Sequence, residues 1–216
     1  MTQEELLSEE ECYVRLRDMI RQGVLMPNQR LVEMDLASSL RAGRATVRTA
    51  LARLEQEGLV ERERYRGARV RLVSEAEAVE ILEVRAAIEG VVARHAAMHA
   101  SDEDAAELER ILAGMEQHVG DNDLLKYSEG NAKLHQMLIR MSRHTTAARV
   151  LDTLNSQNVR FQFRTILSQG RPERSFAEHA AIVEAVVQRN PDAAEQAMRY
   201  HLSNVLQALR TLDAPM

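Results

Sequence analysis

Three histidines in the second half of the chain are each followed by apolar residues at helical spacing. His135 lies in EGNAKLHQMLIRM, and Asn131 precedes it by four residues, so a helix would place their Cβ atoms about 5–6 Å apart on one face. His179 opens the apolar run in FAEHAAIVEAVV, and His201 opens the one in AMRYHLSNVLQAL. Three imidazoles and one amide oxygen inside a helical bundle would suit a divalent ion such as zinc or nickel.

Each of these histidines also has a simpler interpretation. A single histidine on an apolar face is more often a hydrogen-bonded core residue than a metal ligand, so spacing alone leaves both interpretations open. We interpret His95 and His99, another i, i+4 pair, as helix-end residues, and His118 and His144 as exposed residues near helix ends.

Motifs of enzyme chemistry are missing from the sequence. There is no glycine-rich phosphate loop, no Gly-x-Ser-x-Gly turn and no His-Glu-x-x-His. The single cysteine, Cys12, lies in an acidic segment with no histidine nearby in sequence, which is poor support for a nucleophile. The sequence therefore predicts that the protein is not an enzyme.

The stretch GRATVRTALARLEQEGLVERERYRGARVR, residues 43–71, indicates a second kind of chemistry. Val47, Leu51 and Leu54 recur at helical spacing, and two runs with alternating apolar and basic residues follow around Arg66-Gly67. The arginines on or beside the opposite surface of the helix are Arg44, Arg48 and Arg53. A helix followed by a basic ribbon has the geometry of a DNA reader; an arginine-rich surface helix and hairpin is the alternative.

Charge is distributed unevenly along the chain. The net charge is −5, yet residues 13–72 carry thirteen arginines against seven acidic residues, whereas residues 73–216 carry fifteen basic and 21 acidic residues. A basic segment joined to an acidic remainder indicates two domains with different partners. We therefore divide the chain into a DNA-binding domain, 1–72, and a second domain, 73–216.

The elements that would position these residues are mainly helical. Helices at 3–22, 34–41 and 44–57 and the basic ribbon predict a winged helix-turn-helix. The second domain shows no strand pattern, which favours an all-α six-helix bundle. The expected bundle helices are 75–100, 102–119, 121–142, 144–168, 173–190 and 191–212. No segment is apolar enough to cross a membrane or resembles a signal peptide, so we expect a cytoplasmic protein without a membrane partner.

The N-terminal half resembles the GntR family of transcriptional regulators, in its FCD subgroup. Family members show Arg-Leu-x-Glu before the second helix, then Leu-Ala-x-x-Leu-Gly-x-Ser-Arg-x-Pro-Val-Arg, and Arg-Gly in the wing. The sequence departs from that pattern at Arg41, where the family has glycine, at Gly43, where it has serine, and at Thr46, where it has proline. The matching positions are Arg30-Leu31, Glu33, Leu36-Ala37, Leu40, Arg44, Val47-Arg48, Ala50-Leu51, Leu54, Gly58-Leu59 and Arg66-Gly67.

The C-terminal half is similar to an FCD ligand-binding domain. Arg85 and Glu89 match the arginine and glutamate of its first helix. Its metal positions, an Asp or Asn four residues before a histidine and two later histidines, are matched by Asn131, His135, His179 and His201. Asn replaces the usual Asp as first ligand. Six helices after the linker favour the VanR-like type.

The resemblance implies a homodimeric, ligand-responsive regulator, most often a repressor, that binds a pseudo-palindromic operator in double-stranded DNA. It assigns Arg44 and Arg48 to base contacts, and Thr46, Arg53, Arg66 and Gly67 to phosphate and groove positioning. The effector it implies is a small carboxylate bound beside the metal, with Arg85 and Arg160 as candidate contacts; Arg85 could equally pair with Glu89. A metal sensor, in which the ion itself is the effector, and a metal-dependent enzyme fused to a DNA-binding head are the alternatives.

Overall fold

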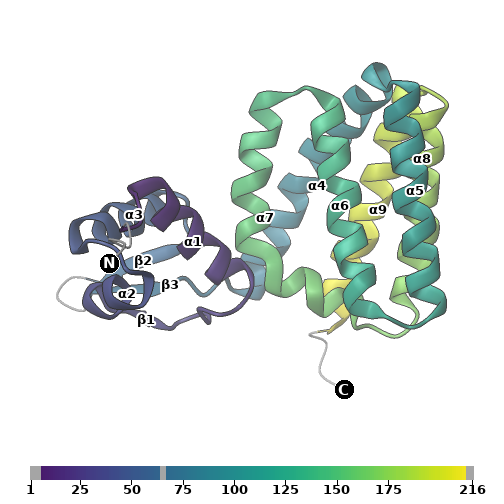
Figure 1. The fold of residues 1–216 in the computed structure, drawn as a ribbon. Helices are drawn as coiled ribbons and strands as arrows, with labels where there is room; N and C mark the ends of the chain where they lie inside the picture. Colours follow the sequence, from purple (N-terminus) through teal and green to yellow (C-terminus); the bar gives the residue numbers. More distant parts are fainter. Residues whose placement is uncertain (1–5, 64–66, 213–216) are drawn as a thin grey trace. The chain divides into compact units, whose positions relative to one another are not determined.

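The computed structural model describes residues 6–63 and 67–212, with only the backbone at 63, 158–160, 162, 163 and 212. It divides into two units, Met1–Ser74, here called the head, and Glu75–Met216, here called the bundle. Figure 1 labels the helices and strands of both. The two units are described separately below.

The head is a three-helix unit with a small sheet. The turn between α2 and α3 is short, because Arg41 adopts a left-handed conformation with φ +52° and ends α2 three residues before α3 begins. This confirms the winged helix-turn-helix. Its elements are α1 (Glu9–Arg21), β1 (Arg30–Leu31), α2 (Glu33–Leu40), α3 (Arg44–Gln56), β2 (Val60–Glu63) and β3 (Gly67–Val70).

Two local details of the head differ from the expectations. The first helix begins at Glu9, because the Ser8 side chain accepts a hydrogen bond from the backbone N–H of Glu11 while the Glu11 carboxylate accepts one from the N–H of Ser8. The short strand β1 was not expected. It pairs antiparallel with β3, which also pairs with β2, so the order in the sheet is β1-β3-β2.

The head has its own core beneath α3. Val47 and Leu54 of α3 are fully buried against Cys12 and Leu16 of α1. The apolar stripe expected on α3 thus faces α1 and the sheet, which leaves the opposite face of α3 in solvent. This orientation determines which side chains of α3 can meet a partner.

The bundle consists of helices, as the sequence predicts. Local signals set their limits; for example, Ser101 caps α5 through Asp104, and Pro191 is the first residue of α9. The bundle helices are α4 (Glu75–His99), α5 (Asp102–Gly120), α6 (Leu124–Ser142), α7 (Thr145–Ile166), α8 (Arg171–Val187) and α9 (Pro191–Leu212).

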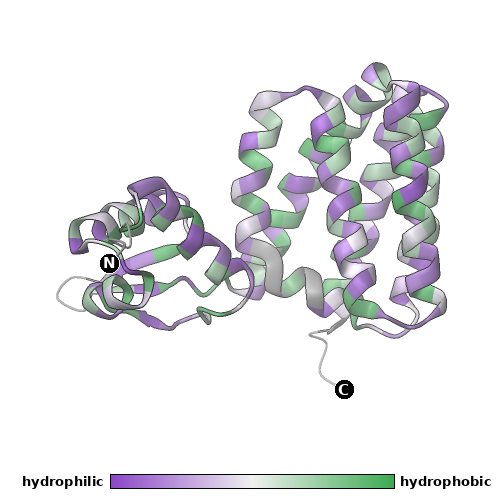
Figure 2. Ribbon diagram, in the orientation of Figure 1, coloured by the Kyte–Doolittle hydropathy of each residue, from purple (hydrophilic) through white to green (hydrophobic). Residues whose placement is uncertain are grey.

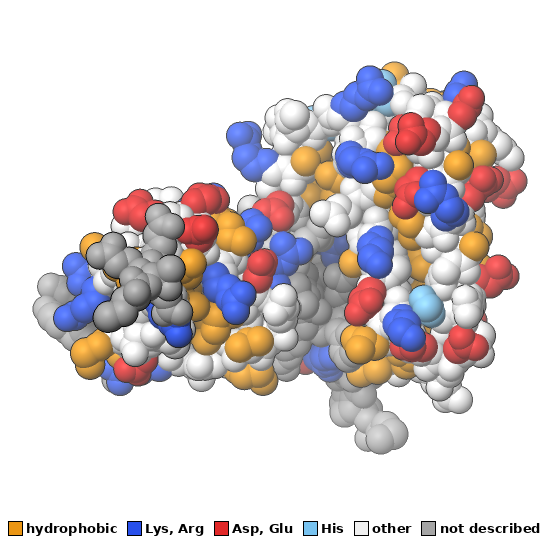
Figure 3. All heavy atoms as spheres, in the orientation of Figure 1, with side chains coloured by type: hydrophobic (Ala, Val, Ile, Leu, Met, Phe, Trp, Pro, Cys, Tyr) orange, Lys and Arg blue, Asp and Glu red, His pale blue; other side chains and the backbone are white. Residues whose placement is uncertain are grey.

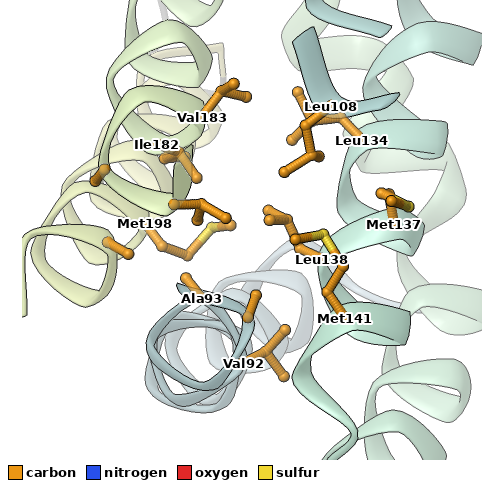
Figure 4. Packing of buried hydrophobic residues seen from close by; sticks show 14 of the residues in the cluster. Val92, Ala93, Leu108, Leu134, Met137, Leu138, Met141, Ile182, Val183 and Met198 are labelled. Atoms are coloured by element: carbon orange, nitrogen blue, oxygen red, sulfur yellow. The ribbon is translucent and has the colours of Figure 1, made fainter. Parts of the chain in front are cut away.

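Helix α4 runs through the bundle and contacts α6, α7, α8 and α9. The apolar core lies where Val92, Leu138, Ile182 and Met198 meet from four helices (Figure 4), each at most 1 % exposed.

Hydrophobic and hydrophilic residues alternate around the bundle helices (Figure 2), and both signs of charge are interspersed on the bundle face seen in Figure 3. Among the described residues, no helix combines the length and apolarity that crossing a membrane requires.

Candidate functional site

Three helices of the bundle bring the expected histidines together. His135 comes from α6, His179 from α8 and His201 from α9, and one ring nitrogen of each lies within 4.8 Å of the others. The Nε2 atoms of His135 and His179 are 3.4 Å apart. All three residues are buried, at 8 %, 0 % and 3 % exposure. The structure therefore joins residues that are up to 66 positions apart in the sequence.

The second ring nitrogen of each histidine has a partner that fixes the ring. Nδ1 of His135 lies 2.6 Å from Oε2 of Glu89, and Nδ1 of His201 lies 2.7 Å from Oε2 of Glu178. Nδ1 of His179 lies 3.4 Å from the Tyr127 hydroxyl. These contacts leave Nε2 of each ring for the shared centre, which is the arrangement that partners of metal-bound histidines impose.

Each of the two glutamates is in turn held by a buried arginine. Arg85 binds Glu89 at 2.7 Å, and Arg171 binds both oxygens of Glu178 at 3.0 and 2.8 Å. Burial favours the protonated form of Glu89, but the charges of Arg85 and His135 outweigh it and hold the pKa of Glu89 well below its usual range. Glu89 can therefore act as a charged acceptor for the imidazole N–H group of His135.

The surroundings of His179 and His201 favour the neutral imidazole. Burial lowers the pKa of His179 and of His201 well below the usual value, and the neighbouring histidines lower both further. Neutral imidazole is the form that offers a lone pair to a metal. Burial also raises the pKa of Tyr127 to about 12, so its hydroxyl stays protonated. The donor set fits a divalent ion.

A small cavity adjoins this cluster. Its volume is about 30 Å³, which is room for one or two water molecules. Asn131 lines it and is buried, at 6 % exposure. The other polar residues lining it are Arg85, Tyr127, His135, Thr165, Arg171, Ser175 and His201. Arg85 therefore pairs with Glu89 and also lines the cavity. Pairing with Glu89 and binding an effector carboxylate are thus compatible roles for Arg85.

Some of these groups were not expected from the sequence. Arg171 and Tyr127 carry no local signal for a role beside the histidines. Glu178 directly precedes His179, yet it binds His201, because consecutive helical side chains point in different directions. Arg160 lies in α7, and its side chain falls outside the described residues.

The remaining histidines do not assemble in the same way. The ring of His95 lies 5.9 Å from that of His99 and 5.3 Å from that of His144. His118 and His144 are half-buried rather than exposed, and Nδ1 of His144 accepts the backbone N–H of Ala147 at the start of α7. Among the residues that the structure describes, His135, His179 and His201 form the only group with metal-ligand spacing.

The solvent-facing side of α3 is the second candidate site. Arg44 and Arg48 are exposed there, together with Ala45 and Thr49, and Thr46 is partly buried. Neither Ala45 nor Thr49, which follows Ala45 by one helical turn, is among the residues predicted from the sequence to contact DNA. Gly67 begins β3 with φ +84°, a conformation that suits glycine, while Arg66 lies outside the described residues.

Arg53 occupies a different environment from the other arginines of α3. Its guanidinium stacks 3.5 Å from the ring centroid of Tyr13 and binds Glu10 at 2.5 Å. Both partners lie on α1, on the side of α3 that faces the head's own core helix. We therefore leave Arg53 out of the DNA-facing surface discussed below.

Comparison with known proteins identifies the chain. Residues 8–70 match the family described as bacterial regulatory proteins, gntR family, and residues 80–204 match the FCD domain. The chain belongs to the GntR family. The resemblance inferred from its motifs is thereby confirmed. The chain is a transcriptional regulator with an FCD domain rather than an enzyme.

Two bacterial proteins are similar to this GntR regulator over most of their length. The repressor RspR of Escherichia coli K12 is 26 % identical over 203 residues, covering 94 % of this chain and 89 % of RspR. The uncharacterized regulator YdhC of Bacillus subtilis 168 is 26 % identical over 202 residues, covering 92 % and 89 %. The solved structure of E. coli McbR/YncC shares the fold, with a TM-score of 0.80 at 17 % identity over 96 % of this chain and 99 % of that one.

Proposed function

We propose that this GntR regulator is a homodimeric repressor that leaves its operator when a small carboxylate binds beside a divalent metal in the bundle. The metal would be held by His135, His179 and His201, with Asn131 as a fourth ligand. RspR is named a repressor, which supports repression rather than activation. Winged-helix dimers bind pseudo-palindromic sites with one reading helix for each half.

The observation that carries the metal assignment is the shared centre of three imidazoles. Their nitrogens converge within 4.8 Å while Glu89, Glu178 and Tyr127 fix the outer ring nitrogens. Imidazole nitrogens suit zinc or nickel. A divalent ion there would supply positive charge that neutral ligands do not compensate, and so attract a carboxylate oxygen.

The cavity supports an acidic effector of small size. Arg85 and Arg171 line it, and guanidinium groups pair well with carboxylates. A volume of about 30 Å³ favours a compact acid. Arg160 stays a predicted contact.

The head would supply operator recognition. Arg44 and Arg48 would reach base edges, and Thr46, Arg66 and Gly67 would contact phosphates and the groove. The exposure of Arg44 and Arg48 on the face of α3 opposite the core supports this assignment. Effector binding regulates the head only if it favours one arrangement of the two reading heads over the other.

The test is DNA release by the full-length, metal-loaded protein. A DNA duplex enriched from a random library with this protein is titrated in the presence of a panel of small carboxylic acids, and the thermal midpoint is recorded with each acid. We expect at least one acid to raise the midpoint and to weaken DNA binding. DNA binding that follows the metal concentration alone would favour the metal sensor, and no response to either would contradict the proposal.

A further inference from the structure

A bidentate ion pair lies on the DNA-facing side of the head. Glu33 is the first residue of α2, and Arg48 is in the second turn of α3. Nε of Arg48 donates to the Glu33 carboxylate at 3.2 Å, and Nη2 donates to Oε2 at 3.0 Å. The Arg48 side chain is 60 % exposed and that of Glu33 30 %. The pair therefore lies at the surface, where DNA would meet α3.

We propose that Glu33 determines the base preference of Arg48 by holding its guanidinium group in one orientation. This inference rests on the proposed role of the head in DNA binding. A guanidinium presents two edges with a pair of parallel donors, one formed by Nε and Nη2 and one by Nη1 and Nη2. Glu33 occupies the first edge. The second edge remains for DNA, and its two donors match O6 and N7 of guanine in the major groove.

The backbone of Arg48 is fixed as well as its side chain. Nη2 of Arg62, on β2, donates to the carbonyl oxygen of Arg48 at 3.2 Å, and Nε of Arg62 binds Glu55 of α3 at 3.3 Å. The start of the wing thus holds the same turn of α3 whose side chain Glu33 orients. Together these contacts limit both the position of the guanidinium and the direction in which its free edge points.

The position of Glu33 argues against a purely structural role. Exposed ion pairs contribute little to stability, and a carboxylate on a DNA-facing surface repels phosphates. Hydrogen bonding to Arg48 lowers the pKa of Glu33, and the nearby charges of Arg62 and Arg44 lower it further, so the carboxylate is ionised at neutral pH. A negative charge that weakens binding to all DNA is useful if it raises selectivity. Selectivity depends on the difference between the binding free energies of the correct and the incorrect DNA sites.

The experiment compares four full-length variants with the wild type. An operator is enriched from a randomised duplex library with the wild-type protein, and affinities are then measured for every single base-pair change in one half-site and for a random duplex. The variants are Glu33→Gln, Arg48→Ala, the double variant, and Glu61→Gln as matched control. Glu61 pairs with Arg69 at 2.6 Å on the sheet, so its change removes one acidic charge from the head without touching Arg48.

We expect Arg48→Ala to lose about tenfold discrimination at one guanine position. Glu33→Gln should lose most of that discrimination at the same base pair while binding the random duplex a few-fold more tightly, because one repelling charge is gone. The double variant should show no further loss at that position, since the two residues act as a unit. Glu61→Gln should tighten random-duplex binding and keep the base preference.

Two results would overturn the inference. If Arg48→Ala loses the discrimination and Glu33→Gln keeps it, Glu33 acts only as a charge and the proposed reading role of Arg48 survives. If Arg48→Ala leaves every base preference unchanged, the assignment of Arg48 in the proposed function fails and the role of Glu33 fails with it. Thermal midpoints of all variants within a few degrees of the wild type exclude misfolding as the cause.

Discussion

The head and the bundle both contain glutamate–arginine pairs, but in opposite surroundings. In the head, Glu33 and Arg48 are 30 % and 60 % exposed, whereas in the bundle Glu178 and Arg171 are 9 % and 5 % exposed. An exposed pair gains little from its attraction, but it leaves the free edge of Arg48 in solvent, where DNA can reach it while Glu33 holds the other edge. A buried pair has lost its hydration, so neither member can be left alone. The first arrangement suits recognition, and the second suits holding imidazoles in place.

The largest expected effect comes from breaking the buried pair. Arg171→Met leaves the Glu178 carboxylate buried without its cation, and we expect a loss of about 3–5 kcal/mol in the free energy of unfolding. Urea unfolding of the full chain, followed by circular dichroism, measures it. Arg48→Met, which opens the exposed pair, should leave the unfolding midpoint unchanged. Equal losses in both variants would contradict the contrast between head and bundle.

A smaller effect is expected from a neutral partner of the histidines. Tyr127→Phe removes the hydroxyl beside Nδ1 of His179, and we expect the affinity for zinc to fall about tenfold, because the ring loses the contact that orients it. A titration against a competing chelator measures this affinity. Tyr200 is 62 % exposed, so Tyr200→Phe should bind zinc like the wild type. An unchanged affinity in Tyr127→Phe would show that the hydroxyl does not position His179.

The smallest expected effect comes from relieving backbone strain at helix ends, and it should be the same in the head and in the bundle. Arg41 ends α2 in the head with φ +52°, and Arg143 ends α6 in the bundle with φ +54°. Glycine adopts this conformation without steric cost, so Arg41→Gly and Arg143→Gly should each stabilise the protein by about 1 kcal/mol. Chemical denaturation of both variants tests this. Destabilisation by Arg41→Gly alone would show that its side chain contributes to the head beyond its backbone position.

Local signals made most of the fold predictable. Pro191 and the Ser101 cap set helix starts in the bundle, because caps and turns act within a few residues. The predicted first helix, 3–22, begins too early, although Ser8 and Glu11 carry the capping signal. Strand β1 could not be predicted from its two residues, because it exists through pairing with β3, whose partner residues are 37 or more positions away.

The candidate site was predictable only in its innermost residues. The histidines stand on apolar helical faces, which the sequence shows. Their partners come from other helices: Glu89 is 46 residues from His135, and Glu178 is 23 residues from His201. Such pairs depend on how the helices pack against one another, and a local sequence pattern does not predict this packing. The surroundings of Arg53 depend on helix packing in the same way, because Tyr13 and Glu10 of α1 lie beside it.

The central claim is that the three imidazoles form a metal site. Its most direct test is the metal content of the full-length protein purified without chelator, beside the variant His179→Ala/His201→Ala. We predict about one zinc or nickel ion for each wild-type chain and none above background in the variant, because only one strong nitrogen ligand remains. Equal metal content in the two proteins would contradict the claim.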